Sequence, residues 1–180
     1  MKSKIFGLVS LSIFIIALFA VFVSATTLSE WPLTTNGIAT NLDSNVNAGI
    51  FTSSGVTSNS FGANGANAED WSLTTLIDTA KYFEVTISPK TGYNLTISDV
   101  NFNYSTSITG PASFELQYST QSSFGSPTSM IIKTDANKTD KTFSNSGLNI
   151  QVGEGKNLTF RWFGYKFSAN TNEFRIENLT

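Results

Sequence analysis

The sequence predicts an all-β protein: a single antiparallel β-sandwich or jelly roll over residues 26–180, preceded by a hydrophobic signal segment over residues 1–25. Three observations lead to this prediction. Apolar and polar residues alternate in short runs, which is the period of a half-buried strand. Clusters of Gly, Pro, Asn and Asp separate these runs at spacings of about 8 to 12 residues, as in sandwiches and barrels. No apolar repeat of helical period and length follows residue 25.

The N-terminal segment has the order of a secretory signal peptide. Two lysines precede an apolar run over residues 5–23, and the small residues Ser24 and Ala25 follow it as a cleavage site. An uncleaved membrane anchor is the alternative, since about 20 apolar residues span a bilayer. The segment therefore predicts a secreted, extracellular or cell-surface protein that meets a membrane only through residues 1–25.

Charge and cysteine content limit the classes of function. The chain has 11 Lys and Arg against 13 Asp and Glu, and without the two lysines of the N-terminal segment the balance is 9 against 13, a net charge of −4. This balance argues against nucleic acid as a partner, because binding to phosphates needs clustered cations. Cysteine is absent, and a domain of this length buries about two-thirds of its unfolded surface without disulfides.

The first clear strand is expected over residues 81–89, where every second residue is apolar. Between residues 93 and 104 the inward parity switches at Asp99, which predicts a bulge or a bend between two sheets. The inward residues are Tyr93, Leu95 and Ile97 before the switch and Val100, Phe102 and Tyr104 after it. Further alternating runs predict strands over residues 113–119, 147–152, 157–162 and 173–178.

Residues 37–67 are rich in Gly, Asn, Ser and Thr and contain only isolated apolar residues. Short strands near Trp31, Phe51 and Val56 would complete the sandwich. Disorder is the alternative, but Trp31 and Trp71 flank the region and predict that it is fixed to the core.

The aromatic strand over residues 157–167 carries the candidate binding site. Phe160 and Trp162 have inward parity and are expected in the core. Gly164 predicts a bulge or a close backbone approach, so Phe163, Tyr165 and Phe167 either continue the outward parity of Arg161 or are reoriented there. Exposed rings would form a sugar platform, because the apolar face of a pyranose stacks on an aromatic ring. The candidate ligand-binding residues are Trp71, Tyr82, Arg161, Phe163 and Tyr165.

Catalysis is not expected. Histidine and cysteine are absent, which removes Ser-His-Asp and Cys-His systems and the usual zinc sites. A glycoside hydrolase would need paired carboxyls, and Glu84 and Glu115 could meet only across strands. Asp135, Asn137 and Asp140 offer oxygen ligands of the calcium type, but a polar hairpin turn is the favoured interpretation. No cofactor is predicted.

Five sequons mark possible N-glycosylation sites. Asn94, Asn103 and Asn157 take polar-face parity and Asn137 lies in a turn, so these four are the candidates. Asn178 shares the parity of inward residues and is the doubtful one.

The ordered landmarks of the chain resemble a β-sandwich domain of secreted microbial proteins. They are "EWPL", "DWS", the run over residues 81–120, "NLTFRWFGYKFS" and the closing "EFRIENLT". That domain occurs in exported proteins with PEP-CTERM or other C-terminal sorting signals, and alongside lamin-tail modules. Its Ser-x-x-Gly-Pro turn corresponds to Ser107–Pro111, and its closing Arg-Ile-Asp-Asn to Arg175–Asn178. The resemblance implies a jelly-roll-like fold similar to carbohydrate-binding modules, without a common ligand or activity.

No sorting signal follows the last predicted strand, which leaves free secretion, an N-terminal anchor or a truncated chain as alternatives. The favoured function is a non-catalytic module that binds a polysaccharide or an envelope glycan. The alternative is a structural or adhesive surface protein or filament subunit that self-associates through edge strands, with the Thr-rich residues 26–37 as a donor strand.

Overall fold

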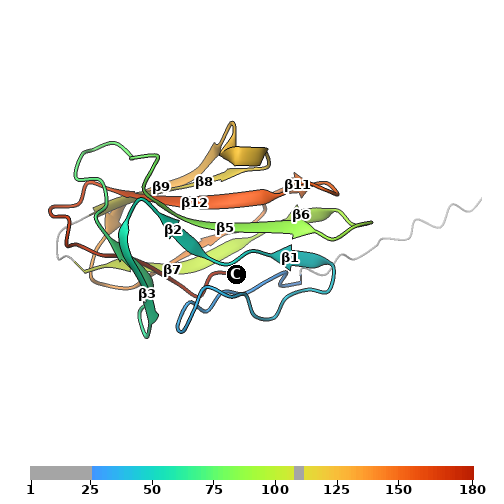
Figure 1. Cartoon of the computed structure of the whole chain (residues 1–180), viewed down its shortest axis with the longest axis horizontal. Coiled ribbons are helices and arrows are strands. Elements are labelled where there is room, and N and C mark those ends of the chain that lie inside the picture. Colours follow the sequence, from blue (N-terminus) through green and yellow to red (C-terminus); the bar gives the residue numbers. More distant parts are fainter. Residues whose placement is uncertain (1–25, 108–111) are drawn as a thin grey trace, which may run out of the picture.

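The computed structural model describes residues 26–107 and 112–180, and there the chain is an all-β sandwich (Figure 1). The predicted signal segment and most of the Ser107–Pro111 turn lie outside these residues. The strands are β1 (Val46–Ala48), β2 (Thr52–Ser54), β3 (Thr57–Gly62), β4 (Gly65–Glu69), β5 (Tyr82–Pro89), β6 (Leu95–Ile97), β7 (Val100–Thr106), β8 (Ala112–Ser119), β9 (Thr128–Ala136), β10 (Lys141–Asn145), β11 (Ile150–Val152), β12 (Leu158–Tyr165) and β13 (Phe174–Glu177). A single 3₁₀ turn, η1 (Ser122–Phe124), follows β8 among the described residues.

Every strand pairing in the described chain is antiparallel. One sheet has six strands in the order β1-β5-β12-β8-β9, with β2 also paired to β5. The facing sheet has five strands in the order β10-β7-β13-β4-β3, and β6 pairs with β11 in a small third sheet. The prediction of an all-β chain with antiparallel sheets is confirmed. Within the described residues, we find no helix with the length and apolar content needed to span a membrane.

The two large sheets pack face to face through aromatic side chains. Phe102 on β7 meets Trp162 on β12 edge-on with ring centroids 5.6 Å apart, and Phe114 on β8 stacks on Phe174 on β13 at 5.1 Å. These rings occupy the alternate positions that the sequence assigns to the inward face. The odd-even pattern of residues therefore sets which side of each sheet forms the core.

The parity switch at Asp99 is confirmed as a bend between sheets. β6 pairs with β11, whereas β7 pairs with β10 and β13 in the five-stranded sheet. The small sheet consequently projects from one end of the sandwich (Figure 1). Tyr93 was predicted to point inward but is 48% exposed. It lies just before β6 begins, so the alternation of the strand does not extend to it.

The turn after β9 differs from its prediction. Residues 135–140 do not form a hairpin, because β9 and β10 belong to different sheets and the turn links the edges of both. Asp135 pairs with Lys141 at 2.6 Å and accepts a hydrogen bond from the Tyr104 hydroxyl of β7 at 3.3 Å. This trio of side chains ties the two sheets together at their corner.

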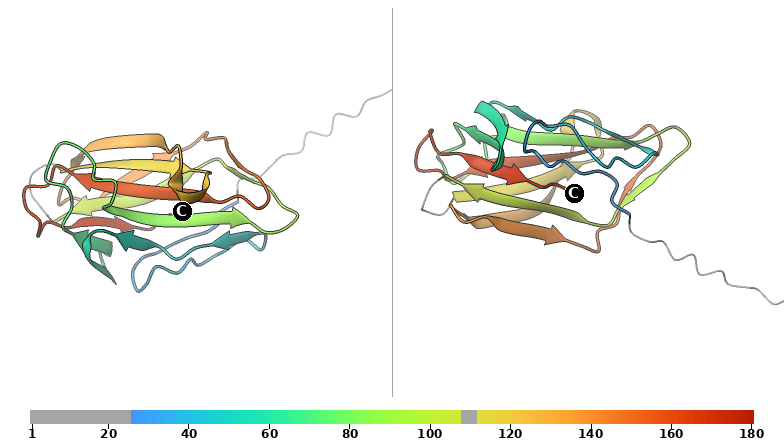
Figure 2. Two further views of the ribbon diagram at one scale, coloured as in Figure 1. Left: turned by 45° about the horizontal axis from the view of Figure 1, so that its top comes forward. Right: turned by 90° about the horizontal axis from the view of Figure 1, so that it is seen from below.

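The segment before β1 packs against its own sandwich. Trp31 is buried, forms an isolated antiparallel bridge with Leu179, and donates its indole N–H to the Gly49 carbonyl at 3.1 Å. Figure 2 shows this segment, in blue, running alongside the sheets. Residues around Trp31 therefore contact strands of their own chain. This argues against the prediction that residues 26–37 act as a donor strand for a neighbouring molecule.

Candidate functional site

Three of the predicted ligand-binding residues meet on the outer face of the six-stranded sheet. The Arg161 guanidinium carbon lies 3.9 Å from the centre of the Tyr82 ring, and its Nε donates to Glu84 Oε2 at 2.6 Å. Phe163 packs edge-on against Tyr82 with centroids 5.9 Å apart. The outward parity of Arg161 and Phe163 on β12, next to β5, brings these side chains together.

Phe124 covers this cluster and was not among the predicted residues. It comes from η1 in the loop between β8 and β9, and its ring centre lies 4.2 Å from the Arg161 guanidinium carbon. Arg161 therefore has an aromatic ring at 3.9 Å and another at 4.2 Å, and Phe163 is only 1% exposed. The rings that were expected to form an open platform are engaged with one another, as in a packed structural cluster.

The remaining two candidates lie apart from this cluster. Trp71 is in the core with 0% exposure, and its indole N–H donates to the Ala68 carbonyl at 2.6 Å. Burial excludes its ring from a surface platform. Tyr165 ends β12 and is half-buried.

Gly164 explains how the end of β12 and the core fit together. A Cβ at this position would lie 2.9 Å from two ring atoms of Trp71. The predicted close backbone approach is therefore present, and Trp71 is the group that approaches. Phe167 then turns inward and stacks on Trp71, with ring centroids 6.5 Å apart.

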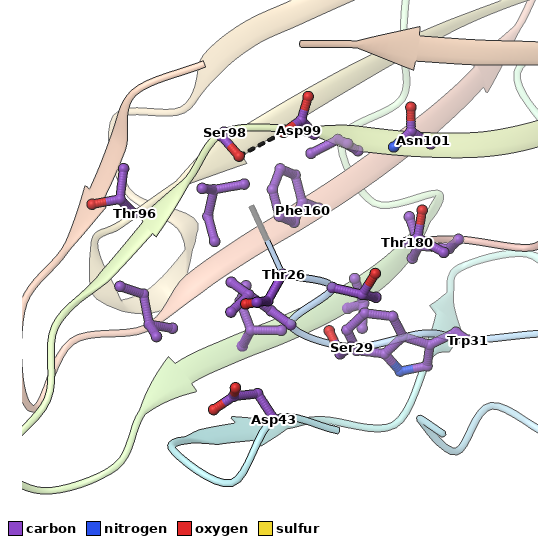
Figure 3. A pocket seen from close by; sticks show the side chains of 18 of the residues that line it. Thr26, Ser29, Trp31, Asp43, Thr96, Ser98, Asp99, Asn101, Phe160 and Thr180 are labelled. Atoms are coloured by element: carbon purple, nitrogen blue, oxygen red, sulfur yellow. Dashed lines mark hydrogen bonds between the residues drawn. The ribbon is translucent and has the colours of Figure 1, made fainter. Parts of the chain in front are cut away.

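A cavity of about 700 Å³ opens between the sheets at the end where β6 and β11 project (Figure 3). Its size lies in the range of small-molecule sites. β5 and β12 supply one wall, and the run from Tyr93 to Asn101 supplies another. The sides are closed by residues 26–29, Trp31, Asp43, Asn45, Leu179 and Thr180. The apolar lining residues are Leu28, Trp31, Val85, Ile87, Leu95, Ile97, Val100, Phe160 and Leu179.

The rim of the cavity is polar and acidic. Asp43 and Asp99 are the charged side chains among its described lining residues, which include no Lys or Arg. Asp43 Oδ1 accepts the Asn45 backbone N–H at 2.7 Å, and the Ser98 hydroxyl donates to Asp99 Oδ2 at 2.5 Å (Figure 3). The half-exposed ring of Tyr93 also lines the cavity. The arrangement offers an aromatic face and hydrogen-bond acceptors above an apolar interior.

The sequence contained one signal for this cavity. The parity switch at Asp99 marks the place where the chain leaves one sheet for another, and the cavity lies beneath that bend. Asp43 and residues 26–31 come from segments without strand periodicity, so no pattern could place them beside β6.

The two glutamates considered for catalysis lie on strands that β12 separates, Glu84 on β5 and Glu115 on β8. Glu84 pairs with Arg161, and Glu115 accepts a hydrogen bond from the Gln117 side-chain amide at 2.9 Å. Within the described ranges, no group of three or more Asp or Glu residues is arranged to hold a metal ion.

The sequon asparagines lie at the surface or half-buried. Asn94 and Asn157 are exposed, and Asn103 and Asn137 are half-buried. Asn178, the doubtful one, is exposed because it follows the end of β13 with a positive φ of 51°. Glycosylation at these positions stays a prediction.

No family model matches the sequence, and no curated protein matches it. Among solved structures, the chain is similar to the K2 cleaved adhesin domain of Lys-gingipain, with a TM-score of 0.39 and 13% sequence identity. The similarity covers 76% of this chain and 88% of that chain. The resemblance to the sandwich domain of exported proteins with sorting signals stays a prediction.

Proposed function

We propose that the protein is an exported, non-catalytic module with a jelly-roll-like sandwich, and that it binds a neutral glycan of a cell envelope or of an extracellular polysaccharide. The observation that carries this proposal is the cavity of about 700 Å³ at the open end of the sandwich, with the Tyr93 ring and the Asp43 carboxylate on its lining.

The chemistry of the rim suits a sugar. The apolar face of a pyranose stacks on an aromatic ring, and Tyr93 is the aromatic side chain of the lining that is most exposed. Hydroxyl groups of a sugar donate hydrogen bonds, and carboxylates are strong acceptors for them. Asn45 and Asn94 add amides to the same lining. These groups come from separate segments of the chain that converge on one opening.

The adhesive alternative divides into two mechanisms. Adhesion to a glycan-covered surface would use the same cavity. Assembly through sheet edges would need long, regular edge strands. Three of the described edge strands are short: β1 and β2 have three residues each, and β10 has five. The pairing of β9 with β8 and of β3 with β4 carries register shifts. Bulges and short strands are the usual devices that keep edges from pairing, so the glycan-binding mechanism is favoured.

Retardation of the purified protein in gels that contain a neutral β-glucan or a mannan tests the proposal. We expect retardation by at least one neutral polysaccharide, and we expect the Tyr93→Ala variant to weaken it by about tenfold in Kd, as for loss of a stacked ring. Tyr165→Ala is the matched control, because Tyr165 is a partly exposed tyrosine away from the cavity. No release of reducing ends is expected during long incubation.

Retardation that is lost with Tyr165→Ala and kept with Tyr93→Ala would place the site on the outer face of β12 and refute the cavity as its location. Migration unchanged by every neutral polysaccharide would refute the glycan.

A further inference from the structure

We propose that the ligand is amphipathic: a neutral sugar joined to an apolar group, with the sugar at the rim of the cavity and the apolar group between the sheets. This inference rests on the proposed function and names the ligand class for the same cavity.

The interior of the cavity favours a hydrocarbon over a sugar ring. Val85 and Ile87 of β5, Phe160 of β12 and Val100 of β7 contribute side chains that carry no hydrogen-bonding atom. A sugar placed among them would give up its hydrogen bonds to water without replacement, which is unfavourable. An alkyl group there loses only contact with water, which is favourable by about fourfold in affinity per buried methylene.

The rim selects the charge of the ligand head. Asp43 and Asp99 each receive one hydrogen bond from the protein, on Oδ1 and Oδ2 respectively. Figure 3 shows the Asp99 carboxylate pointing away from the cavity. The second oxygen of Asp43 accepts no hydrogen bond from the described residues, so it remains an acceptor for a ligand hydroxyl. An anionic head, such as a uronate, a fatty-acid carboxylate or a phosphate, would meet the Asp43 carboxylate and no Lys or Arg side chain of the described lining. Repulsion by Asp43 and lost solvation therefore weaken the binding of such a head relative to a neutral one.

Calorimetry with alkyl glycosides below the concentration at which they form micelles tests the inference. We expect octyl β-glucoside to bind, glucose alone to bind at least 100-fold more weakly, and affinity to rise about fourfold per methylene from the hexyl to the octyl glucoside. Octyl glucuronide has the same length but an anionic head, and we expect it to bind at least tenfold more weakly than octyl glucoside.

Variants at the rim give the matched control. The variant Asp43→Asn keeps the side-chain shape and should bring the affinities for octyl glucoside and octyl glucuronide within about threefold of each other. Asp78→Asn should leave the tenfold gap unchanged. Asp78 is the control because it makes the same local contact as Asp43 but lies outside the cavity. Its carboxylate accepts a hydrogen bond from the Ala80 backbone N–H at 3.0 Å, just as Asp43 accepts one from the Asn45 backbone N–H.

The outcomes separate this inference from the proposed function. Neutral oligosaccharides that bind through Tyr93 with no gain from an alkyl chain would overturn the inference and leave the proposed function standing. Binding of 1-octanol as tight as that of octyl glucoside would also overturn the inference, because the sugar head would then add nothing, whereas the proposed function is refuted only by unchanged migration in every neutral polysaccharide. Equal affinity for octyl glucoside and octyl glucuronide would overturn the assignment of a neutral head.

Discussion

Arg161 shows how one residue can look like a ligand-binding group in sequence and act as a structural one in the fold. The guanidinium has the Tyr82 ring centre at 3.9 Å, the Phe124 ring centre at 4.2 Å, and Glu84 at 2.6 Å. Phe124 comes from a 3₁₀ turn that has no apolar pattern of its own, so its position over β12 could not be read from the chain.

The first prediction compares Arg161 with Arg175, because each pairs with a glutamate at similar exposure. The side chains of Arg161 and Glu84 are 19% and 28% exposed. Those of Arg175 and Glu173 are 24% and 25% exposed. No described aromatic ring lies over the Arg175 guanidinium. Arg161→Gln should lower the free energy of unfolding by about 1–2 kcal/mol, because it removes two cation–π contacts and an ion pair. Arg175→Gln should cost less than about 1 kcal/mol. Urea denaturation measures both, and equal costs would contradict the structural role of the rings.

Tyr104 carries a second prediction at this scale, on pH. Burial, the nearby charge of Asp135 and the hydrogen bond to that carboxylate raise the pKa of Tyr104 from 10.0 to about 12. A pKa that is higher in the folded than in the unfolded state means that stability is constant below about pH 10 and falls as the pH rises toward 12.

Absorbance of tyrosinate at 295 nm should show one tyrosine that ionises near pH 12. Tyr104→Phe should remove that step, and Asp135→Asn should move it to lower pH, since burial then remains without the charge. A step near pH 12 that survives in Tyr104→Phe would show that another tyrosine is responsible.

At the scale of elements, strands with strict alternation were predictable and irregular ones were not. β5, β7, β8, β12 and β13 each bury every second side chain over most of their length, and all five were expected from the sequence. β9 was not expected, because Ile131 and Ile132 are adjacent and two register shifts interrupt its pairing with β8. β4 buries Ala66 and Ala68 against β13, and alanine gives almost no apolar signal.

β12 supports a prediction on packing. Gly164→Ala would place a methyl group 2.9 Å from the fully buried ring of Trp71, which has no room to move. We expect the free energy of unfolding to fall by about 1–3 kcal/mol, as for overpacking of a core. Gly153→Ala is the control, because the nearest atom to its Cβ would be Asn94 Oδ1 at 3.7 Å. Thermal or urea denaturation measures both variants. Equal stability of Gly164→Ala and Gly153→Ala would contradict the close contact with Trp71.

At the scale of the whole molecule, the cavity forms where one stretch of chain passes from one sheet to another. The chain from Tyr93 to Thr106 serves two sheets, so it bends at Ser98 and Asp99 and leaves an opening that neither large sheet fills. The bend was predictable from the parity switch, but its consequence was not, because the cavity needs the N-terminal segment, Asp43 and the C-terminal residues in place around it. On the outer face of β12, the predicted residues Arg161 and Phe163 contact Tyr82, and Phe124 of η1 lies over Arg161.

The location of the ligand tests the account most directly. Backbone amide shifts of ¹⁵N-labelled protein, titrated with the neutral glycan that gives the strongest retardation, report which residues change environment on binding. The account predicts shifts concentrated over residues 93–101 and 43–45, around the cavity. Shifts concentrated instead at Tyr82, Arg161 and Tyr165, with residues 93–101 unchanged, would contradict it.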